Sequence, residues 1–259
     1  MANERVLPLE QVHNFRDYGG YATRDGGTVR RNLLFRSGHH AEATTDDLSA
    51  IDALALAHVV DLRGNGERES HPVRLPGGFA GELLHFDGET AGLGAHLGAL
   101  DGAMTAEDAH SAMEKLYSTL PKRENLIWIL KRYFTALAKG EGASLVHCHA
   151  GKDRTGMAVD LLHHALGVHP DDAMEDFLLT NKAGDQDARI AQSAPTIRAR
   201  YGAVDDETVR VVMGVDARYL HAARKALVDA HGSVDAFLHD VLGVDEEGRK
   251  ALRLHLVEM

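Results

Sequence analysis

Cysteine, tryptophan and long apolar runs are scarce in this chain of 259 residues. It has one cysteine and one tryptophan, and aromatic residues make up 5% of it. A single cysteine excludes an internal disulfide and suits a reducing compartment. No run approaches the roughly 18 apolar residues of a membrane-spanning helix, and the first residues lack the apolar core of a secretory signal. We therefore expect a cytoplasmic protein without stable membrane insertion, although secretion without a signal peptide is compatible with the same sequence.

Positively charged residues are also fewer than negatively charged ones. The chain has 28 lysines and arginines and 39 aspartates and glutamates, which gives a formal net charge of −11. Overall repulsion of this kind opposes a nucleic-acid backbone as partner. The 17 histidines are mostly scattered, and the adjacent pairs His39-His40 and His163-His164 do not have the i,i+4 spacing of helical metal ligands. We therefore expect no metal site, no cofactor and no nucleic-acid partner; the sequence does not indicate an oligomeric state.

Strand-like and helix-like segments alternate along most of the chain. Short apolar runs predict buried strands, and longer runs with apolar residues three or four positions apart predict helices. The expected strands are 57–62, 82–86 and 143–148, and the expected helices are 106–120, 123–139, 154–166, 170–180, 185–200, 216–231, 233–242 and 245–257. Residues 1–40 are expected to form short strands and turns, and 64–78 a loop. This order predicts an α/β fold, with a central, mostly parallel sheet flanked by helices, in a single domain over residues 1–259.

Residues 88–105 consist largely of glycine and alanine, which offer little surface for a core. The segment is too long for an ordinary connection, so it predicts a mobile flap. With the helix that follows, it is expected to form a helical lid insertion over about residues 88–122.

The most informative segment is His-Cys-His-Ala-Gly-Lys-Asp-Arg-Thr-Gly at residues 147–156, which contains the only cysteine. Cys148 follows the apolar run 143–146, and five residues separate it from Arg154. A thiol is mostly protonated at neutral pH, so a site that uses the thiolate has to stabilise it. The N–H groups of a five-residue loop and a helix N-terminus favour an anion, and the planar guanidinium of Arg154 matches two phosphate oxygens. The spacing therefore predicts a loop that holds a phosphate against a thiolate.

Two other interpretations of this segment are less favourable. A lone cysteine at a strand end is often a small buried hydrophobic residue, but two neighbouring cations, Lys152 and Arg154, are unusual in a purely structural connection. The nucleotide-binding pattern Gly-x4-Gly-Lys-Ser/Thr requires glycine at position 146 and Ser or Thr at 153. The chain has Val146 and Asp153 there, so that pattern fails.

The segment 147–156 resembles the signature of cysteine-dependent protein tyrosine phosphatases, and more narrowly that of a bacterial atypical group with mycobacterial and Listeria members. The segments 14–20, 34–37 and 60–63, with Glu67 soon after, are also similar to that group. The resemblance covers nearly the whole chain and implies a cysteine-phosphatase-like fold. It implies hydrolysis of phosphotyrosine, with phosphoserine, phosphothreonine and phosphoinositides as further substrates. The alternatives are a rhodanese-type sulfurtransferase and an inert phosphate-binding module.

Roles follow for each residue of the segment. Cys148 is expected to be the nucleophile and Arg154 the phosphate clamp, while Thr155 is expected to donate a hydrogen bond to the sulfur. Two carboxylates compete as general acid: the resemblance implies Asp153 inside the loop, whereas Asp87, just past a strand, lies where ordinary tyrosine phosphatases carry a mobile acid. The phosphate-binding residues are expected to be His149, Ala150, Gly151, Lys152, Asp153 and Arg154, with Lys152 giving extra attraction for multiply charged substrates. Asn14 and Arg16 are expected either to form a structural turn or to approach the site.

Overall fold

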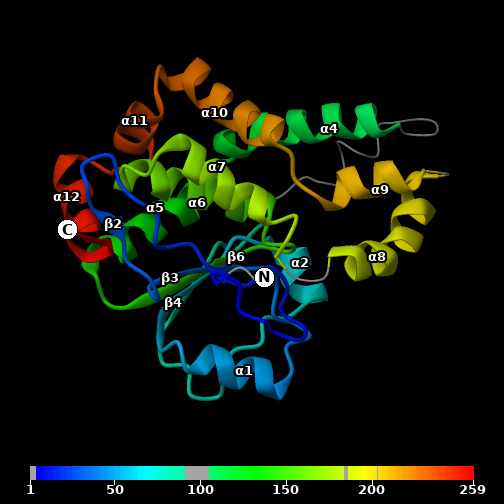
Figure 1. Cartoon of the computed structure of the whole chain (residues 1–259), viewed down its shortest axis with the longest axis horizontal. Coiled ribbons are helices and arrows are strands. Elements are labelled where there is room, and N and C mark those ends of the chain that lie inside the picture. Colours follow the sequence, from blue (N-terminus) through cyan, green and yellow to red (C-terminus); the bar gives the residue numbers. More distant parts are fainter. Residues whose placement is uncertain (1–3, 91–104, 184–185, 203) are drawn as a thin grey trace.

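A five-stranded sheet forms the centre of the molecule (Figure 1). The computed structural model describes residues 4–90, 105–183, 186–202 and 204–259. In the order of the sheet, the strands are β1 (Arg16–Asp17), β3 (Leu34–Ser37), β6 (Ala143–His147), β4 (Leu56–Asp61) and β5 (Glu82–His85). The pairs β3–β6, β6–β4 and β4–β5 are parallel, and only β1 runs antiparallel within this sheet. The predicted α/β class with a mostly parallel sheet is confirmed.

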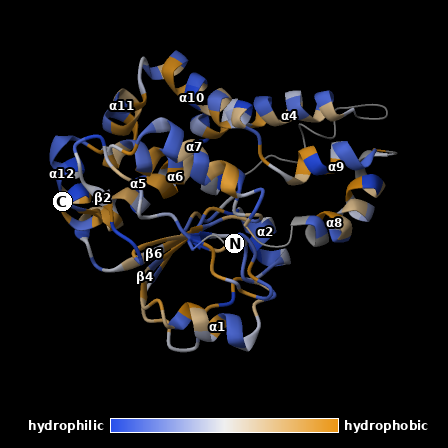
Figure 2. Ribbon diagram, viewed as in Figure 1, coloured by the Kyte–Doolittle hydropathy of each residue, from blue (hydrophilic) through white to orange (hydrophobic). Residues whose placement is uncertain are grey.

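Alternate residues of the central strands are buried on opposite faces of the sheet, as the two-residue period of a strand requires. Val60 and Val146 belong to the larger hydrophobic cluster, whereas Val59 and Leu145 belong to the smaller one. Figure 2 shows the apolar character of these strands. Both faces are therefore covered, which explains why the strands are nearly continuous apolar runs.

The helices divide unequally between the two faces (Figure 1). The smaller cluster contains α1 (Thr45–Asp52), whose first turn is closed by a capping box between Thr44 and Asp47. The larger cluster contains residues of α5 (Glu124–Lys139), α6 (Asp153–Leu166), α7 (Pro170–Leu179), α10 (Ala217–His231) and α12 (Glu246–Leu256). Gly140 and Gly167 end α5 and α6 with positive φ angles of 69° and 85°, a conformation that favours glycine.

A third hydrophobic cluster joins α4 (Ala106–Thr119), α8 (Gln186–Tyr201) and α9 (Asp206–Met213). Helix α4 also packs along α10, as Figure 1 shows. The chain after α4 forms a short 3-10 turn, η1 (Leu120–Lys122), at the predicted break around Pro121. Residues 91–104, most of the predicted mobile flap, lie outside the described residues, so the lid insertion over 88–122 stays a prediction.

Several expectations for the connections were incomplete. Residues 64–78 contain the short helix α2 (Asn65–Ser70), and the helix α9 was not predicted at all. The expected helix 233–242 is divided into α11 (Val234–Ala236) and a π-helical turn, η2 (Phe237–Val241). The chain ends in β7 (Val257–Glu258), which pairs with β2 (Thr28–Val29) in a second small sheet. The other expected helices are within two residues of their observed bounds. No described helix is both long enough and apolar enough to cross a membrane.

Candidate active site

The candidate site lies at the carboxyl ends of the parallel strands, where ligands bind in open sheets of this kind. Strand β6 ends at His147, Cys148 follows with 2% of its surface exposed, and α6 begins at Asp153. The neighbouring strands β3 and β4 end in register with it, because Ser37 and Asp61 both pair with His147. The loop between β6 and α6, residues 148–152, is called the phosphate loop below.

The backbone of the phosphate loop is held from outside through its carbonyl groups. Asn14 donates from Nδ2 to the carbonyl oxygen of Gly151 at 2.8 Å, and Arg36 donates from Nη2 to the same oxygen at 2.9 Å. Gly151 has φ of +67°, and a Cβ atom at this position would lie 2.2 Å from the carbonyl oxygen of Ser37. Only glycine fits there. With this carbonyl turned outward, the opposite side of the loop is free for N–H groups to converge on an anion.

Asp176 of α7 anchors the arginines behind the loop. It forms ion pairs with Arg16 Nε at 3.0 Å and with Arg36 Nη1 at 2.6 Å, and all three side chains are buried. Burial alone would raise the pKa of Asp176, but the charges of Arg16 and Arg36 lower it well below its ordinary value. Asn14 joins this network by accepting a hydrogen bond from Arg16. The expected approach of Asn14 to the site is therefore observed as a loop-positioning contact.

Arg154 is fixed by a two-point ion pair with Glu67 of α2. Its Nη1 and Nη2 atoms lie 2.6 and 2.7 Å from the two carboxylate oxygens of Glu67. Nη1 also donates to the Leu62 carbonyl oxygen at 3.1 Å and to Thr90 Oγ1 at 3.2 Å. All these bonds, in the part of the chain that the structure describes, use Nη1 and Nη2 alone. The edge of the guanidinium formed by Nε and the second N–H of Nη2 therefore stays available for two phosphate oxygens.

The charges around Arg154 keep it protonated. Burial alone would lower the pKa of Arg154, but its hydrogen bonds to Glu67 and the charge of Cys148 outweigh the effect of burial and raise this pKa above its ordinary value. Burial alone would likewise raise the pKa of Glu67, whereas its bonds with Arg154 lower it. Both members of the pair are therefore charged at neutral pH. The resemblance singled out Glu67, but its role was not deduced from the sequence.

Asp153 faces α4 at the start of α6. Its Oδ1 atom accepts a hydrogen bond from the Tyr117 hydroxyl at 2.9 Å, and both residues are buried. Burial first, and the charge of Asp153 second, raise the pKa of Tyr117 well above its ordinary value, so the phenol stays a donor. The charge of Cys148 also raises the pKa of Tyr117. The structure thus brings the predicted internal acid together with an unpredicted tyrosine.

Lys152 is buried and turns toward α9. Its Nζ atom donates to the carbonyl oxygens of Val212 at 2.6 Å and Gly214 at 3.2 Å, and lies 3.8 Å from Asp153 Oδ1. The cation therefore sits at the C-terminal end of a helix, where carbonyl groups and the helix dipole favour positive charge. In this conformation its ammonium group ties the loop to α9.

The remaining predicted loop residues occupy distinct positions. Thr155 is fully buried, and its Oγ1 atom has no hydrogen-bond partner among the described residues. His149 exposes its side chain at the rim, and Ala150 is half-buried. Thr155 is thus placed one residue after Arg154 with a free hydroxyl donor, although no hydrogen bond to the cysteine sulfur is observed.

Asp87, the other candidate acid, follows β5 and is bound to α2. Its side chain is exposed after β5 and accepts a hydrogen bond from Asn65 Nδ2 at 2.9 Å. Among the described residues, no hydrogen bond or ion pair joins Asp87 to residues 148–155. Asp153 is the first residue of α6, directly after the phosphate loop.

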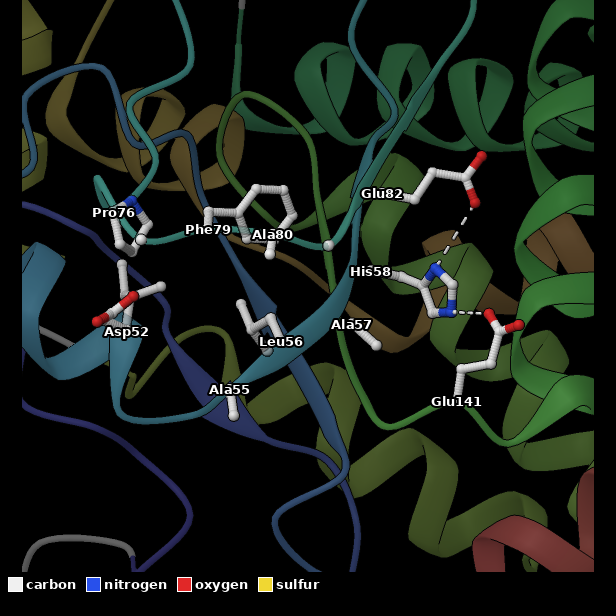
Figure 3. Close-up of a pocket in the computed structure, with 13 residues that line it drawn as sticks. Asp52, Ala55, Leu56, Ala57, His58, Pro76, Phe79, Ala80, Glu82 and Glu141 are labelled. Carbon is white, nitrogen blue, oxygen red and sulfur yellow. Dashed lines mark ion pairs between the residues drawn. The ribbon is translucent and has the colours of Figure 1, made fainter.

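A separate pocket lies at the opposite edge of the sheet (Figure 3). His58 points there between Glu141 and Glu82, with nitrogen-to-oxygen distances of 3.2 and 3.8 Å. His58 pairs with Ser144, four residues before Cys148, which corresponds to about 13 Å along a strand. This pocket is therefore not part of the candidate active site. No group of three or more His, Cys, Asp or Glu among the described residues could hold a metal ion.

The chain is similar in sequence to known proteins over most of its length. A family model described as the tyrosine phosphatase family matches residues 7–258. The chain is 34% identical over 245 residues to a protein of Cupriavidus necator whose name places it among the tyrosine-protein phosphatases, covering 92% of this chain and 85% of that protein. It is 30% identical over 265 residues to the triple specificity protein phosphatase PtpB of Mycobacterium tuberculosis, covering 91% of this chain and 93% of PtpB.

Among solved structures, the crystal structure of Pseudomonas aeruginosa TpbA is similar over 75% of this chain and 96% of TpbA. The TM-score is 0.33 and the sequence identity 17%. The family model and the two sequence relatives each extend over nearly the full length and include the phosphate loop. The chain therefore belongs to the tyrosine phosphatase family and is an enzyme of that family.

Proposed function

We propose that this phosphatase cleaves phosphate monoesters through a cysteinyl-phosphate intermediate, with Cys148 as nucleophile. The observation that carries the proposal is the combination of a buried Cys148, outward-held loop carbonyls and an Arg154 fixed by Glu67. Preorganised donors of this kind stabilise the charge on a transferring phosphoryl group. Arg154 would bind two phosphate oxygens through its free edge and place the phosphorus in line with the sulfur.

The reaction divides into two displacements. In the first, the Cys148 thiolate forms an S–P bond, the P–O bond to the leaving group breaks, and Asp153 gives its proton to the departing oxygen. In the second, Asp153 accepts a proton from water, the water oxygen bonds to phosphorus, and the S–P bond breaks. The buried, unpartnered hydroxyl of Thr155 supports its role as a donor to the leaving sulfur.

Tyr117 supports the assignment of Asp153 as the acid. Because its phenol donates to one carboxylate oxygen at 2.9 Å, the other oxygen can carry the proton toward the substrate. The alternative acid, Asp87, would need to leave Asn65 and approach the loop. We therefore place Asp153 in the acid role and keep Asp87 as the residue to compare.

We further propose that phosphotyrosine is one of several substrates, with phosphoserine, phosphothreonine and phosphoinositides as the others. The relative in M. tuberculosis carries the name of a triple specificity phosphatase. This supports a broad substrate range, at an identity of 30%.

Hydrolysis of phosphotyrosine and phosphoserine peptides and of a soluble phosphoinositide headgroup, measured side by side by phosphate release, tests the proposal. Cys148→Ser should abolish all three activities while inorganic phosphate still binds, because the serine variant keeps the loop and Arg154. Full activity in that variant would rule out the proposed nucleophile. Activity on phosphotyrosine alone would rule out the broad range and keep the reaction.

A further inference from the structure

Three histidine side chains from different loops meet at the rim of the phosphate loop. His39 follows β3, His71 caps the end of α2, and His149 follows the nucleophile. Their ring centroids lie 4.7 Å apart for His39–His149, 5.0 Å for His39–His71 and 5.1 Å for His71–His149. We call this group the histidine rim. Because each ring contacts both others, the three form a compact cluster, and one of its members, His149, belongs to the phosphate loop.

The backbone holds the histidine rim in place. His39 donates its N–H to the His149 carbonyl oxygen at 2.9 Å. The His71 carbonyl oxygen accepts a hydrogen bond from Arg63 Nη1 at 2.7 Å, and Arg63 is itself paired with the buried Asp61. The three rings are therefore carried by parts of the chain that already hold one another in place.

The charged groups that face the rim are mostly positive. Burial, followed by the charges of His149 and His71, lowers the pKa of His39 to about 3, and Arg63 and His147 act in the same direction. His149 is exposed on one side, and the partial burial of its ring is the first cause that lowers its pKa; His71, Arg154 and Arg63 act in the same direction and Glu67 opposes them. His39 and His149 are thus neutral at pH 7. Glu67 is the carboxylate that opposes this effect on His149, and both its oxygens accept hydrogen bonds from Arg154.

Neutral imidazole rings still offer N–H donors. His39 Nδ1 lies 3.3 Å from the Ala41 backbone nitrogen, which donates to it. The proton of the neutral His39 ring is therefore on Nε2. None of the three rings lies within ion-pair distance of a carboxylate in the part of the chain that the structure describes, so their remaining donors are not used by acidic partners.

We propose that His39, His71 and His149 form a second anion subsite, which takes a second phosphate of a compact bisphosphorylated substrate while the first phosphate lies in the phosphate loop. The inference rests on the proposed function, because it assumes that the scissile phosphate occupies the loop. His149 is adjacent to Cys148, so a second phosphate close to the first would meet the rim. Without that anion, the rings disfavour one another's protonation; with it, positive charge on the rim becomes favourable.

The sign of the pH dependence follows from this coupling. A bound second phosphate raises the pKa of His149, so binding takes up a proton near neutral pH. Affinity for the bisphosphate should therefore increase as the pH falls. A ligand with a single phosphate, held by the loop alone, should lack this contribution.

Inorganic phosphate and pyrophosphate are the two probes, with pyrophosphate as the compact ligand that carries two phosphoryl groups. Their binding to the wild-type protein, His39→Asn and His71→Asn is measured by calorimetry between about pH 8 and about pH 5.5, where histidine titrates. His39→Asn keeps an acceptor for the Ala41 N–H. His221→Asn, an exposed histidine on α10, is the matched control. Aryl phosphate hydrolysis is measured in the same samples.

At the lowest pH, the wild type and His221→Asn should prefer pyrophosphate to phosphate. In His39→Asn and His71→Asn this preference should be smaller by a factor of about ten or more, which corresponds to the loss of one charge-assisted hydrogen bond. His71→Gln keeps a side-chain N–H donor, so it should keep part of the preference, and the pH dependence should remain because His149, which takes up the proton, is unchanged. Equal preference in all variants at every pH, with hydrolysis intact, would overturn the subsite. If the wild-type protein does not hydrolyse the aryl phosphate but still prefers pyrophosphate to phosphate through the histidine rim, the proposed function is refuted and the subsite is not.

Discussion

Replacing Glu67 with glutamine removes one charge from the pair that holds Arg154 and keeps the shape of the side chain. In the wild type, the two carboxylate oxygens accept from Nη1 and Nη2 at 2.6 and 2.7 Å. Glutamine has one carbonyl oxygen and one NH2 group, so one of these contacts would place donor against donor. Arg154 should then lose its fixed orientation, and the edge that binds phosphate should no longer be held toward Cys148.

The size of the effect follows from burial and charge. A hydrogen bond to a charged group contributes about 1.5–3 kcal/mol, and breaking a fully buried ion pair costs about 3–5 kcal/mol. The side chain of Arg154 is 3% exposed and that of Glu67 25%, so solvent screens part of the loss. We take about 2 kcal/mol, which corresponds to a decrease in kcat/KM of about 30-fold.

Steady-state hydrolysis of an aryl phosphate, with inorganic phosphate as competitive inhibitor, measures both consequences. Glu67→Gln should lower kcat/KM and weaken phosphate inhibition together. Glu69→Gln, an exposed glutamate on the same helix, should change neither. If Glu67→Gln binds phosphate more tightly than the wild type, Glu67 competes with the substrate for Arg154, and the positioning role is refuted.

Three further predictions concern the acid, its support and the buried network. Asp153→Asn should remove the basic limb of the pH–rate profile of kcat, because no proton reaches the leaving group; if Asp87→Asn does so instead, the acid assignment is wrong. Tyr117→Phe should lower kcat about tenfold for a leaving group of high basicity and little for an activated aryl phosphate, because the lost bond orients the proton donor; equal effects on both substrates would contradict this. Asp176→Asn should lower the free energy of unfolding by about 3 kcal/mol in urea at neutral pH, because two buried arginines lose their counter-charge. The lowered pKa of Asp176 stabilises the native state above about pH 4, and this stabilisation is lost as the pH falls. The difference in free energy of unfolding between Asp176→Asn and the wild type should therefore decrease in acid. A difference that stays constant with pH would contradict the account.

The phosphate loop could be predicted from the sequence because its chemistry is local. Cys148, Arg154 and Thr155 lie within eight consecutive positions, after an apolar strand and before a helical pattern. The α/β class with a mostly parallel sheet could also be predicted, because strand-like and helix-like segments alternate along the chain. In the structure, Cys148 does follow a strand, β6, and Arg154 and Thr155 do lie at the start of a helix, α6.

The support for the loop could not be predicted in the same way. Glu67 is 87 positions from Arg154, and Tyr117 is 36 positions from Asp153. A single glutamate or tyrosine carries no signal of its partner until the fold brings the two together. The resemblance named Glu67, but only the three-dimensional arrangement gives it a role.

The direction of Lys152 depended on a helix that the sequence interpretation missed. Asp205 does provide a capping signal, because its side chain accepts from the Thr208 N–H at 2.8 Å. Helix α9 is only eight residues long, too short for its apolar period to stand out. The sequence indicated that Lys152 adds attraction for multiply charged substrates, and it gave no sign of the helix end that its ammonium group contacts in the structure.

Trapping of the covalent intermediate tests the central claim most directly. Wild-type protein mixed with a rapidly cleaved aryl phosphate and quenched in acid should carry one phosphoryl group, which mass spectrometry should locate on the peptide that contains Cys148, the only cysteine. Asp153→Asn should accumulate more of this species, because the same residue activates water in the second step. A phosphoryl group on any other residue, or hydrolysis with a burst of product and no modified Cys148, would contradict the account.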